Sequence, residues 1–326
     1  MKGPPRFIDL VQDRNAPPAA APRDDPAPME PVAAALARQH FAEFDLEFDA
    51  AERILFCRFA HRGGQCLTEE LLREGQEMQR LVRGLLGDGR EQEPPVCFLV
   101  LASRAPRVWN LGADLKLFAG LIRSRDRANL RRYAHSCCGF AFANATGLGF
   151  DLPVVSVALI QGDALGAGFE LALSSNLIVA ERSAKFGLPE ILFNLFPGMG
   201  AVSFLSRRIP AGLAERLILS GEIYGAEQLH ALGAVDVLAP DGQGVAALHE
   251  FIGRRGTRYP ALRALYRARR LVNPVTLEEL TRIADLWVEA AFKLDESDLR
   301  KMLHLDAAQA RRRAGENHHF ATIRSN

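Results

Sequence analysis

The sequence predicts an α/β fold that ends in a helical C-terminal region. Along most of the chain, short apolar runs typical of strands alternate with longer stretches in which apolar residues recur at helical spacing. Beyond residue 240 the pattern is mostly helical. Strands that alternate with helices indicate an α/β core, in which helices cover the faces of a sheet.

The chain divides into three parts by composition. Residues 1–31 hold eight of the 18 prolines, and proline both lacks an amide donor and restrains the residue before it, so we expect this part to be flexible. Residues 32–240 carry the alternating pattern and form the predicted core. Residues 241–326 form the predicted helical C-terminal region.

The first elements of the core are two strands and a helix. Residues 44–48 alternate apolar and polar side chains, and residues 54–59 form a second strand, so the short link between them predicts a hairpin. Residues 67–86 show helical spacing of leucine, methionine and valine. The continuous apolar run at 96–101 suits a strand that is covered on both faces.

The second half of the core repeats this alternation. One long helical stretch is expected over 115–145, and a buried strand over 154–160. A glycine-containing turn then leads into a short helix over 169–174. Two further strands are expected at 177–180 and 235–238, and no internal repeat is visible.

Composition excludes several classes of protein. The 326 residues include 40 basic and 39 acidic side chains, a balance that provides no bulk positive charge for nucleic acid. With 48% hydrophobic residues the chain is not intrinsically disordered, and no apolar run is long enough to span a bilayer. The five cysteines have no framework spacing, and the N-terminus lacks an apolar secretory core. We therefore expect a cytoplasmic protein with reduced thiols.

The densest chemical signal is the turn that contains Gly162, Gly166 and Gly168, between a strand and a helix. Small residues let a ligand approach the backbone, and free amides at a helix start favour negative charge. The turn lacks the Gly-Lys-Ser/Thr ending of a Walker loop, and no acidic residue follows at the offset of a dinucleotide fold.

Two glutamates stand among apolar neighbours downstream of this turn. Glu170 lies one turn into the helix, and Glu190 follows the sequence Phe-Gly-Leu-Pro. Each is either a structural carboxylate, such as a helix-dipole partner, or a functional one. Burial raises the pKa of a carboxyl group, as general acid–base catalysis requires. A glycosidase also uses paired carboxylates, but the apolar surroundings favour an acyl substrate.

Other clusters carry less weight. His135, Cys137 and Cys138 lack the spacing of a zinc site and are expected to be packed or solvated on a helix, so no metal and no cofactor is predicted. Ser174 lacks a nucleophile elbow. Arginines gather in two groups that either form solvated helix faces or dock an acidic carrier protein: Arg123, Arg125, Arg127, Arg131 and Arg132, and Arg254, Arg255, Arg258, Arg263, Arg267, Arg269 and Arg270.

Three motifs together carry a resemblance to a known family. Gly-Asp-Ala-Leu-Gly-Ala-Gly-Phe-Glu at 162–170, Phe-Gly-Leu-Pro-Glu at 186–190 and Pro-Gly-Met-Gly at 197–200 strongly resemble the crotonase (enoyl-CoA hydratase) superfamily. The segment 110–115 resembles the first oxyanion-hole segment of that family. The segments 109–118, 190–201 and 282–288 look like bacterial synthases of diffusible signal factors (DSF), the cis-2-unsaturated fatty acids of quorum sensing.

The resemblance implies a fold and a role for each matched residue. It implies a spiral of ββα units, and trimers or hexamers of the chain. Glu170 and Glu190 match the catalytic glutamates. The remaining matches are two oxyanion-hole amides, at Leu111 or Gly112 and at Ala167 (where the family usually has glycine), a water-holding amide at Gly198, and substrate-binding residues at Asn110, Met199, Trp287 and Leu305.

The implied activity is dehydration of a 3-hydroxyacyl thioester on acyl carrier protein, or on CoA, followed by thioesterase cleavage that releases the free cis-2-enoic acid. Two other functions stay open at this point. One is a generic enoyl-CoA hydratase or isomerase, a lyase without hydrolysis of the thioester. The other is a crotonase-fold module that binds a signalling partner such as a sensor kinase.

Overall fold

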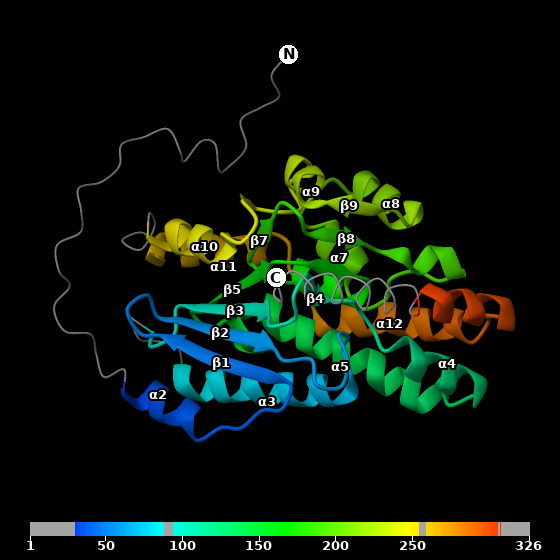
Figure 1. Cartoon of the computed structure of the whole chain (residues 1–326), viewed down its shortest axis with the longest axis horizontal. Helices are drawn as coiled ribbons and strands as arrows, with labels where there is room; N and C mark the ends of the chain where they lie inside the picture. Colours follow the sequence, from blue (N-terminus) through cyan, green and yellow to red (C-terminus); the bar gives the residue numbers. More distant parts are fainter. Residues whose placement is uncertain (1–29, 88–93, 254–258, 306, 308–326) are drawn as a thin grey trace, which may run out of the picture.

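A six-stranded sheet forms the centre of the protein, in a computed structural model that describes residues 30–87, 94–253, 259–305 and 307. Its first two strands are antiparallel and all other neighbours are parallel (Figure 1). In spatial order the strands are β1 (Phe44–Asp49), β2 (Ile54–Phe59), β3 (Phe98–Ser103), β5 (Val155–Ile160), β7 (Leu177–Glu181) and β10 (Val237–Ala239). The predicted α/β class is therefore confirmed, and so is the expected hairpin, in which Phe44 faces Phe59 and Asp49 faces Ile54.

The two faces of this sheet bury two separate cores. Alternate residues of one strand belong to different cores: Leu99 and Leu101 face α3 (Glu69–Leu86) and α5 (Arg127–Ala145). Phe98 and Val100 face the opposite side, where they pack with residues of α10 (Gly244–Gly253) and α11 (Tyr259–Val272). This period-two alternation explains why the predicted strands read as continuous apolar runs.

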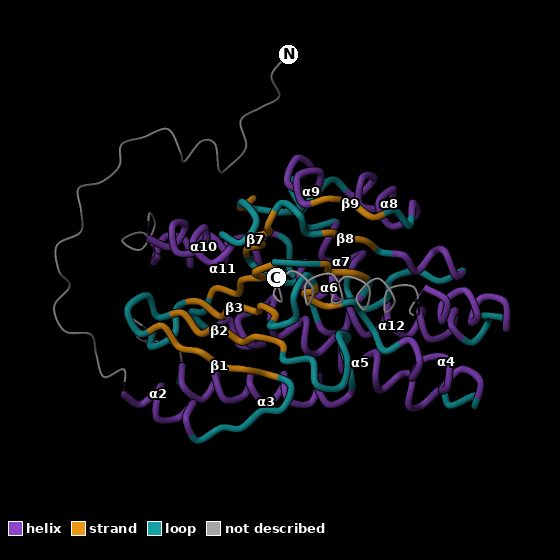
Figure 2. The backbone as a smooth tube through the Cα atoms, in the orientation of Figure 1, coloured by secondary structure: helices purple, strands orange, loops and turns teal. Residues whose placement is uncertain are grey.

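A second sheet consists of four strands of three residues each (Figure 2). In spatial order they are β4 (Val108–Asn110), β6 (Asp163–Leu165), β8 (Lys185–Gly187) and β9 (Ile223–Gly225). The first three are parallel, and β9 is antiparallel to β8. Sequence patterns did not reveal these strands, because three residues are too few to establish a period.

The expected helix over 115–145 is two helices, α4 (Leu115–Arg123) and α5. Arg125 has a left-handed backbone with φ of 60°, and the Asp126 side chain accepts a hydrogen bond from the Asn129 amide to begin α5. A left-handed residue followed by an N-cap ends one helix and starts another, even within a stretch that has helical spacing throughout.

The other helices frame these sheets. They are α2 (Glu30–Ala37), α6 (Ala167–Leu173), α7 (Ala201–Leu205), α8 (Ala211–Ser220), α9 (Ala226–Leu232) and α12 (Leu277–Ala291), with a π turn η1 (Gly147–Asp151) and a 3-10 turn η2 (Pro189–Phe193). The predicted flexible segment 1–31 lies outside the described residues except for its last two, where α2 begins. In the described part of the chain, no helix is long and apolar enough to cross a membrane.

The region after residue 240 does not stand apart from the core. Helix α10 contacts β5 and β7, and α12 packs along α5. The predicted helical character of this region is confirmed over α10, α11 and α12.

Candidate active site

Three chemistry-bearing turns meet because β4, β6 and β8 are parallel neighbours. The carboxyl ends of parallel strands lie at one edge of a sheet, which is where ligands bind in open α/β folds. Asn110 closes β4, Gly166 follows β6, and Pro189 begins η2 shortly after β8. The small sheet thus brings together the three motifs that are far apart in the sequence.

A largely apolar cavity opens at this edge. Concave apolar surfaces with a few convergent polar groups are typical of small-molecule sites. Eight of the ten predicted site residues line it, and these are Leu111, Ala167, Glu170, Glu190, Gly198, Met199, Trp287 and Leu305. Asn110 and Gly112 are not part of the lining.

Glu170 is a buried carboxylate on α6, with 2% of its surface exposed. Its Oε1 accepts hydrogen bonds from the amides of Met199, at 2.9 Å, and Ala201, at 2.8 Å. Burial raises the pKa of Glu170, and the amides that face it lower that pKa only in part. The carboxylate is therefore fixed in direction and able to hold a proton near neutral pH.

Glu190 projects from η2 into the same cavity. Pro189 occupies the first turn of η2, and left-handed Asn194 ends it, so the carboxylate sits on a short rigid element. Its Oε2 is buried without a hydrogen-bond partner among the described residues. Burial is the main cause that raises the pKa of Glu190, and the nearby Glu170 raises it further.

The pair therefore favours a state with one carboxylate and one carboxylic acid, because two negative charges in one buried site repel each other. Gly166 makes their approach to the backbone feasible. A β-carbon at Gly166 would lie 2.9 Å from Glu190 Oε1, and the residue has a positive φ of 50°. Only glycine satisfies both demands at this point.

Ala167 supplies a free backbone donor beside the carboxylates. It is the first residue of α6, where helix geometry leaves amides without an internal acceptor, and none of the described residues accepts from it. The β-carbon of Ala167 is accommodated, since only 4% of the residue is exposed and it belongs to the apolar core.

The second predicted oxyanion-hole donor, at Leu111 or Gly112, is not a free amide. The Leu111 amide donates to the Gln65 carbonyl at 2.8 Å, and the Gly112 amide donates to Asn110 Oδ1 at 2.9 Å. Both amides already have partners within the chain. In this conformation neither Leu111 nor Gly112 presents a vacant N–H to the cavity.

The next amide, that of Ala113, faces the other way. The Gly112 carbonyl accepts from Leu67 N at 2.7 Å, and in a trans peptide the following N–H points opposite to the carbonyl. Ala113 N–H therefore points away from Leu67, and Ala113 lines the cavity. The motif alone does not indicate this residue, because the amide directions at 111–113 depend on hydrogen bonds with Gln65, Leu67 and Asn110.

Asn110 and Gly198 have structural neighbours that explain their identities. Asn110 is fully buried and lies against α6, where a β-carbon on Gly168 would come within 2.3 Å of the Asn110 carbonyl oxygen. A β-carbon on Gly198 would lie 2.3 Å from the Trp287 β-carbon. Asn110 thus supports the wall of the site from behind, whereas Gly198 lets α12 approach closely.

Trp287 and aromatic neighbours form the apolar wall. The Trp287 ring lies 4.8 Å from the ring of Phe118 and is 2% exposed. Leu305 and Met199 complete the predicted part of this wall. Further lining residues, which the sequence analysis did not predict, are Leu115, Phe118, Phe193 and Leu195. Such a surface suits an acyl chain.

The remaining candidate clusters contain buried thiols and ion pairs within the chain. Cys137 and Cys138 are buried free thiols on α5, and burial raises the pKa of Cys138 to about 12, so it is not an activated nucleophile. His135 contacts Asp285 at 2.8 Å. Several of the clustered arginines form ion pairs inside the chain: Arg123–Glu296, Arg131–Asp285, Arg267–Asp151 and Arg270–Asp151. Arg254, Arg255 and Arg258 lie outside the described residues.

Curated hydratases are similar to this chain in sequence. The chain is 35% identical over 130 residues to 2,3-dehydroadipyl-CoA hydratase of Escherichia coli, covering 40% of this chain and 50% of the relative. It is 33% identical over 168 residues to human mitochondrial methylglutaconyl-CoA hydratase, covering 49% and 45%. The chain thus spans about half the length of the curated relatives it matches.

Solved structures share the fold. An enoyl-CoA hydratase from Bacillus halodurans aligns with a TM-score of 0.63 at 21% identity, covering 81% of this chain and all of that one. DspI of Pseudomonas aeruginosa aligns with a TM-score of 0.55 at 24% identity, covering 75% and 95%. Residues 88–254, about half of the chain, match the model of the enoyl-CoA hydratase/isomerase family. The protein therefore belongs to the enoyl-CoA hydratase/isomerase family, the crotonase superfamily that its motifs resemble.

Proposed function

We propose that this protein is an acyl-thioester dehydratase with thioesterase activity, similar to the DSF synthases. Its substrate is a 3-hydroxyacyl group on acyl carrier protein or CoA, and its product is a free cis-2-unsaturated fatty acid. The observation that carries this proposal is the pair Glu170 and Glu190, both with raised pKa, at one apolar cavity beside the free Ala167 amide.

The proposed dehydration uses the two protonation states of the pair. The ionised carboxylate removes the α-proton, and negative charge moves to the thioester oxygen. In this proposal the amides of Ala113 and Ala167 stabilise that oxyanion, and each such donor is worth about 3 kcal/mol in other enzymes. The protonated carboxyl then gives its proton to the departing 3-hydroxyl, so that water leaves and the double bond forms.

The proposed hydrolysis uses the same groups. A carboxylate takes a proton from water, whose oxygen attacks the thioester carbonyl, and the thiol of the carrier leaves with a proton. Gly198 lines the cavity, and the resemblance implies that its amide holds that water. We further propose that residues 241–326 cover the acyl pocket, because Trp287 and Leu305 both come from this region.

Product analysis tests the proposal. Purified protein is incubated with a 3-hydroxyacyl carrier protein and, separately, with the matching CoA thioester, and the released lipid is identified by mass spectrometry with double-bond geometry. Free cis-2-enoic acid supports the proposal. Exclusive release of enoyl thioester, without free acid, contradicts the thioesterase step.

A generic enoyl-CoA hydratase is the second candidate, favoured by the family match over residues 88–254 and by the hydratase names of the relatives. The same assay, run with 2-enoyl-CoA, distinguishes it: formation of 3-hydroxyacyl-CoA as the sole product assigns the hydratase function. Binding of a sensor kinase, the trimer or hexamer and a cytoplasmic location stay predictions.

A further inference from the structure

The direction of the Ala113 amide depends on a loop that contains no proposed catalytic residue. Residues 61–67 run beside residues 110–114, and two backbone hydrogen bonds join them: Leu111 N to Gln65 O at 2.8 Å, and Leu67 N to Gly112 O at 2.7 Å. The second bond turns the Gly112 carbonyl toward the loop and hence the Ala113 N–H away from it. If the loop shifts, the proposed oxyanion donor shifts with it.

The side chain of Tyr133 hydrogen-bonds to both of these segments. The Tyr133 hydroxyl, on α5, donates to the Leu67 carbonyl and accepts from the Asp114 amide at 3.2 Å. Leu67 pairs with Ala113 across the contact, and Asp114 is the next residue after Ala113. The phenol is 2% exposed, and burial raises its pKa well above the usual value, so it keeps its proton as a donor.

The ring of Tyr133 is itself fixed. It packs edge-on against Phe118 with a centroid distance of 5.2 Å, and Phe118 in turn contacts Trp287. Phe118 and Trp287 both line the cavity. The hydroxyl is therefore held at a defined point by the same aromatic cluster that forms the acyl wall.

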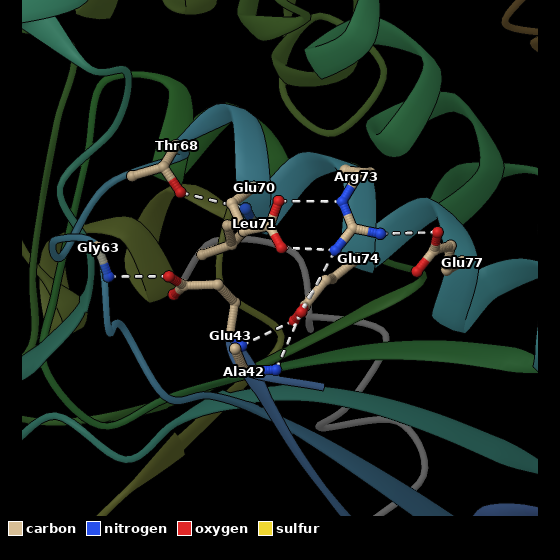
Figure 3. A network of polar contacts seen from close by, with 9 residues as sticks. All are labelled: Ala42, Glu43, Gly63, Thr68, Glu70, Leu71, Arg73, Glu74 and Glu77. Atoms are coloured by element: carbon tan, nitrogen blue, oxygen red, sulfur yellow. Dashed lines mark hydrogen bonds and ion pairs between the residues drawn. The ribbon is translucent and has the colours of Figure 1, made fainter. Parts of the chain in front are cut away.

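The loop is anchored on its other side by two buried carboxylates (Figure 3). Glu43 accepts from the amides of Arg62, at 3.0 Å, and Gly63, at 2.8 Å. Glu74, on α3, accepts from the amides of Ala42, at 2.9 Å, and Glu43, at 2.7 Å. Figure 3 shows Glu74 of α3 in contact with Ala42 and Glu43, which precede β1, and Glu43 in contact with Gly63 of the loop. With one end fixed in this way, the Tyr133 hydroxyl determines how the loop presents Leu67.

We propose that Tyr133 is a positioning residue for catalysis, whose hydroxyl clamps residues 61–67 onto residues 110–114 and so directs the Ala113 amide at the substrate oxygen. This inference rests on the proposed function, since it concerns the oxyanion of that reaction. Loss of the hydroxyl removes no atom that touches substrate. It frees the Leu67 carbonyl and the Asp114 amide, and the donor between them loses its fixed direction.

The test is Tyr133→Phe, which keeps the ring and deletes the hydroxyl. We expect kcat on the thioester substrate to fall by about 10- to 100-fold, the effect of a displaced oxyanion donor, with KM within about twofold of wild type. Acetoacetyl-CoA serves as a probe, because its enolate has an absorbance band. That band should weaken in the variant at saturating probe.

The matched control is Tyr259→Phe. The Tyr259 hydroxyl is also buried and donates to a backbone carbonyl, that of Pro153, but it lies in the opposite core behind the six-stranded sheet. We expect this control to lose similar stability and to keep kcat. A second variant, Glu43→Gln, loosens the loop from its other end and should lower kcat in the same direction as Tyr133→Phe.

Hydrogen exchange separates this inference from the proposed function. Faster exchange at residues 108–114 in Tyr133→Phe, but not in Tyr259→Phe, supports the clamp even if the wild type turns out to have no thioester activity. Unchanged exchange there overturns the clamp. Equal kcat in Tyr133→Phe and the wild type overturns the catalytic role, whatever the stability of the variant.

Discussion

The two sheets of this protein have opposite properties. The six-stranded sheet has long strands such as β5, every residue of which is buried, and its faces carry the two cores. The four-stranded sheet has strands of three residues, yet its parallel strands end in the turns that carry Glu170, Glu190 and Ala167.

The difference is one of physical cause. The large sheet is stabilised by apolar area, at about 1.5–3 kcal/mol for each large side chain that is fully buried. The small sheet depends on close contact of backbones, which only glycine permits at several points. A β-carbon on Gly162 would lie 2.0 Å from the Arg107 carbonyl carbon, and one on Gly168 would lie 2.3 Å from the Asn110 oxygen. The large sheet thus carries the two apolar cores, whereas the turns that line the cavity follow the strands of the small sheet.

The largest expected effect is a loss of kcat, and it tests whether catalysis depends on the two carboxyl groups beside the small sheet and not on a carboxyl group of the large sheet. Glu170→Gln and Glu190→Gln should each lower kcat by about 10²- to 10⁴-fold, the usual contribution of a general acid or base. The control is Glu181→Gln at the end of β7 in the large sheet, a buried carboxylate that accepts from Gly244 N and Gln161 Nε2. Steady-state kinetics should show this control near wild type. A comparable loss of kcat in Glu181→Gln would break the comparison.

The next effect tests backbone contact. Gly168→Ala forces a methyl group onto Asn110, so we expect a loss of about 3 kcal/mol in the free energy of unfolding. Gly84→Ala is the matched change in α3, where no atom lies within 4 Å of the added carbon. It should stabilise the protein by about 0.5–1 kcal/mol. Denaturant unfolding measures both, and equal effects would contradict the role assigned to close backbone contact.

A smaller effect depends on pH. The folded-state pKa of Glu190 lies above its unfolded value, so the folded protein binds more protons between the two values, and stability falls as pH rises through that range. Glutamine has no such dependence. We expect Glu190→Gln to equal wild type in stability near pH 4 and to exceed it by about 1–3 kcal/mol at pH 9. An advantage that is independent of pH would contradict the burial of an ionised group.

The smallest effect concerns Ala167. Glycine keeps the amide donor but has more freedom in the unfolded chain, so Ala167→Gly should cost about 0.5–1 kcal/mol of stability. Because the amide persists, kcat should change by less than about threefold. Thermal unfolding and kinetics measure the two quantities, and a large fall in kcat would show that the methyl group itself contributes to the site.

Sequence patterns predicted the long elements, in which the spacing of apolar residues is regular. The apolar runs of β3 and β5 were recognised because a strand buried on both faces consists of apolar residues. Glu170 and Glu190 were recognised by motif, and both line the cavity. The break between α4 and α5 was missed, because a single left-handed residue, Arg125, leaves the apolar spacing unchanged.

The sequence by itself determined the fold class, the family and the two carboxylates, since these depend on residue type and local spacing. Tertiary structure alone decided which amide faces the cavity. Leu111, Gly112 and Ala113 are adjacent in sequence, and their N–H directions differ because Gln65, Leu67 and Asn110 each take a different partner. The bonds with Gln65 and Leu67 join distant segments of the chain, which no local pattern encodes.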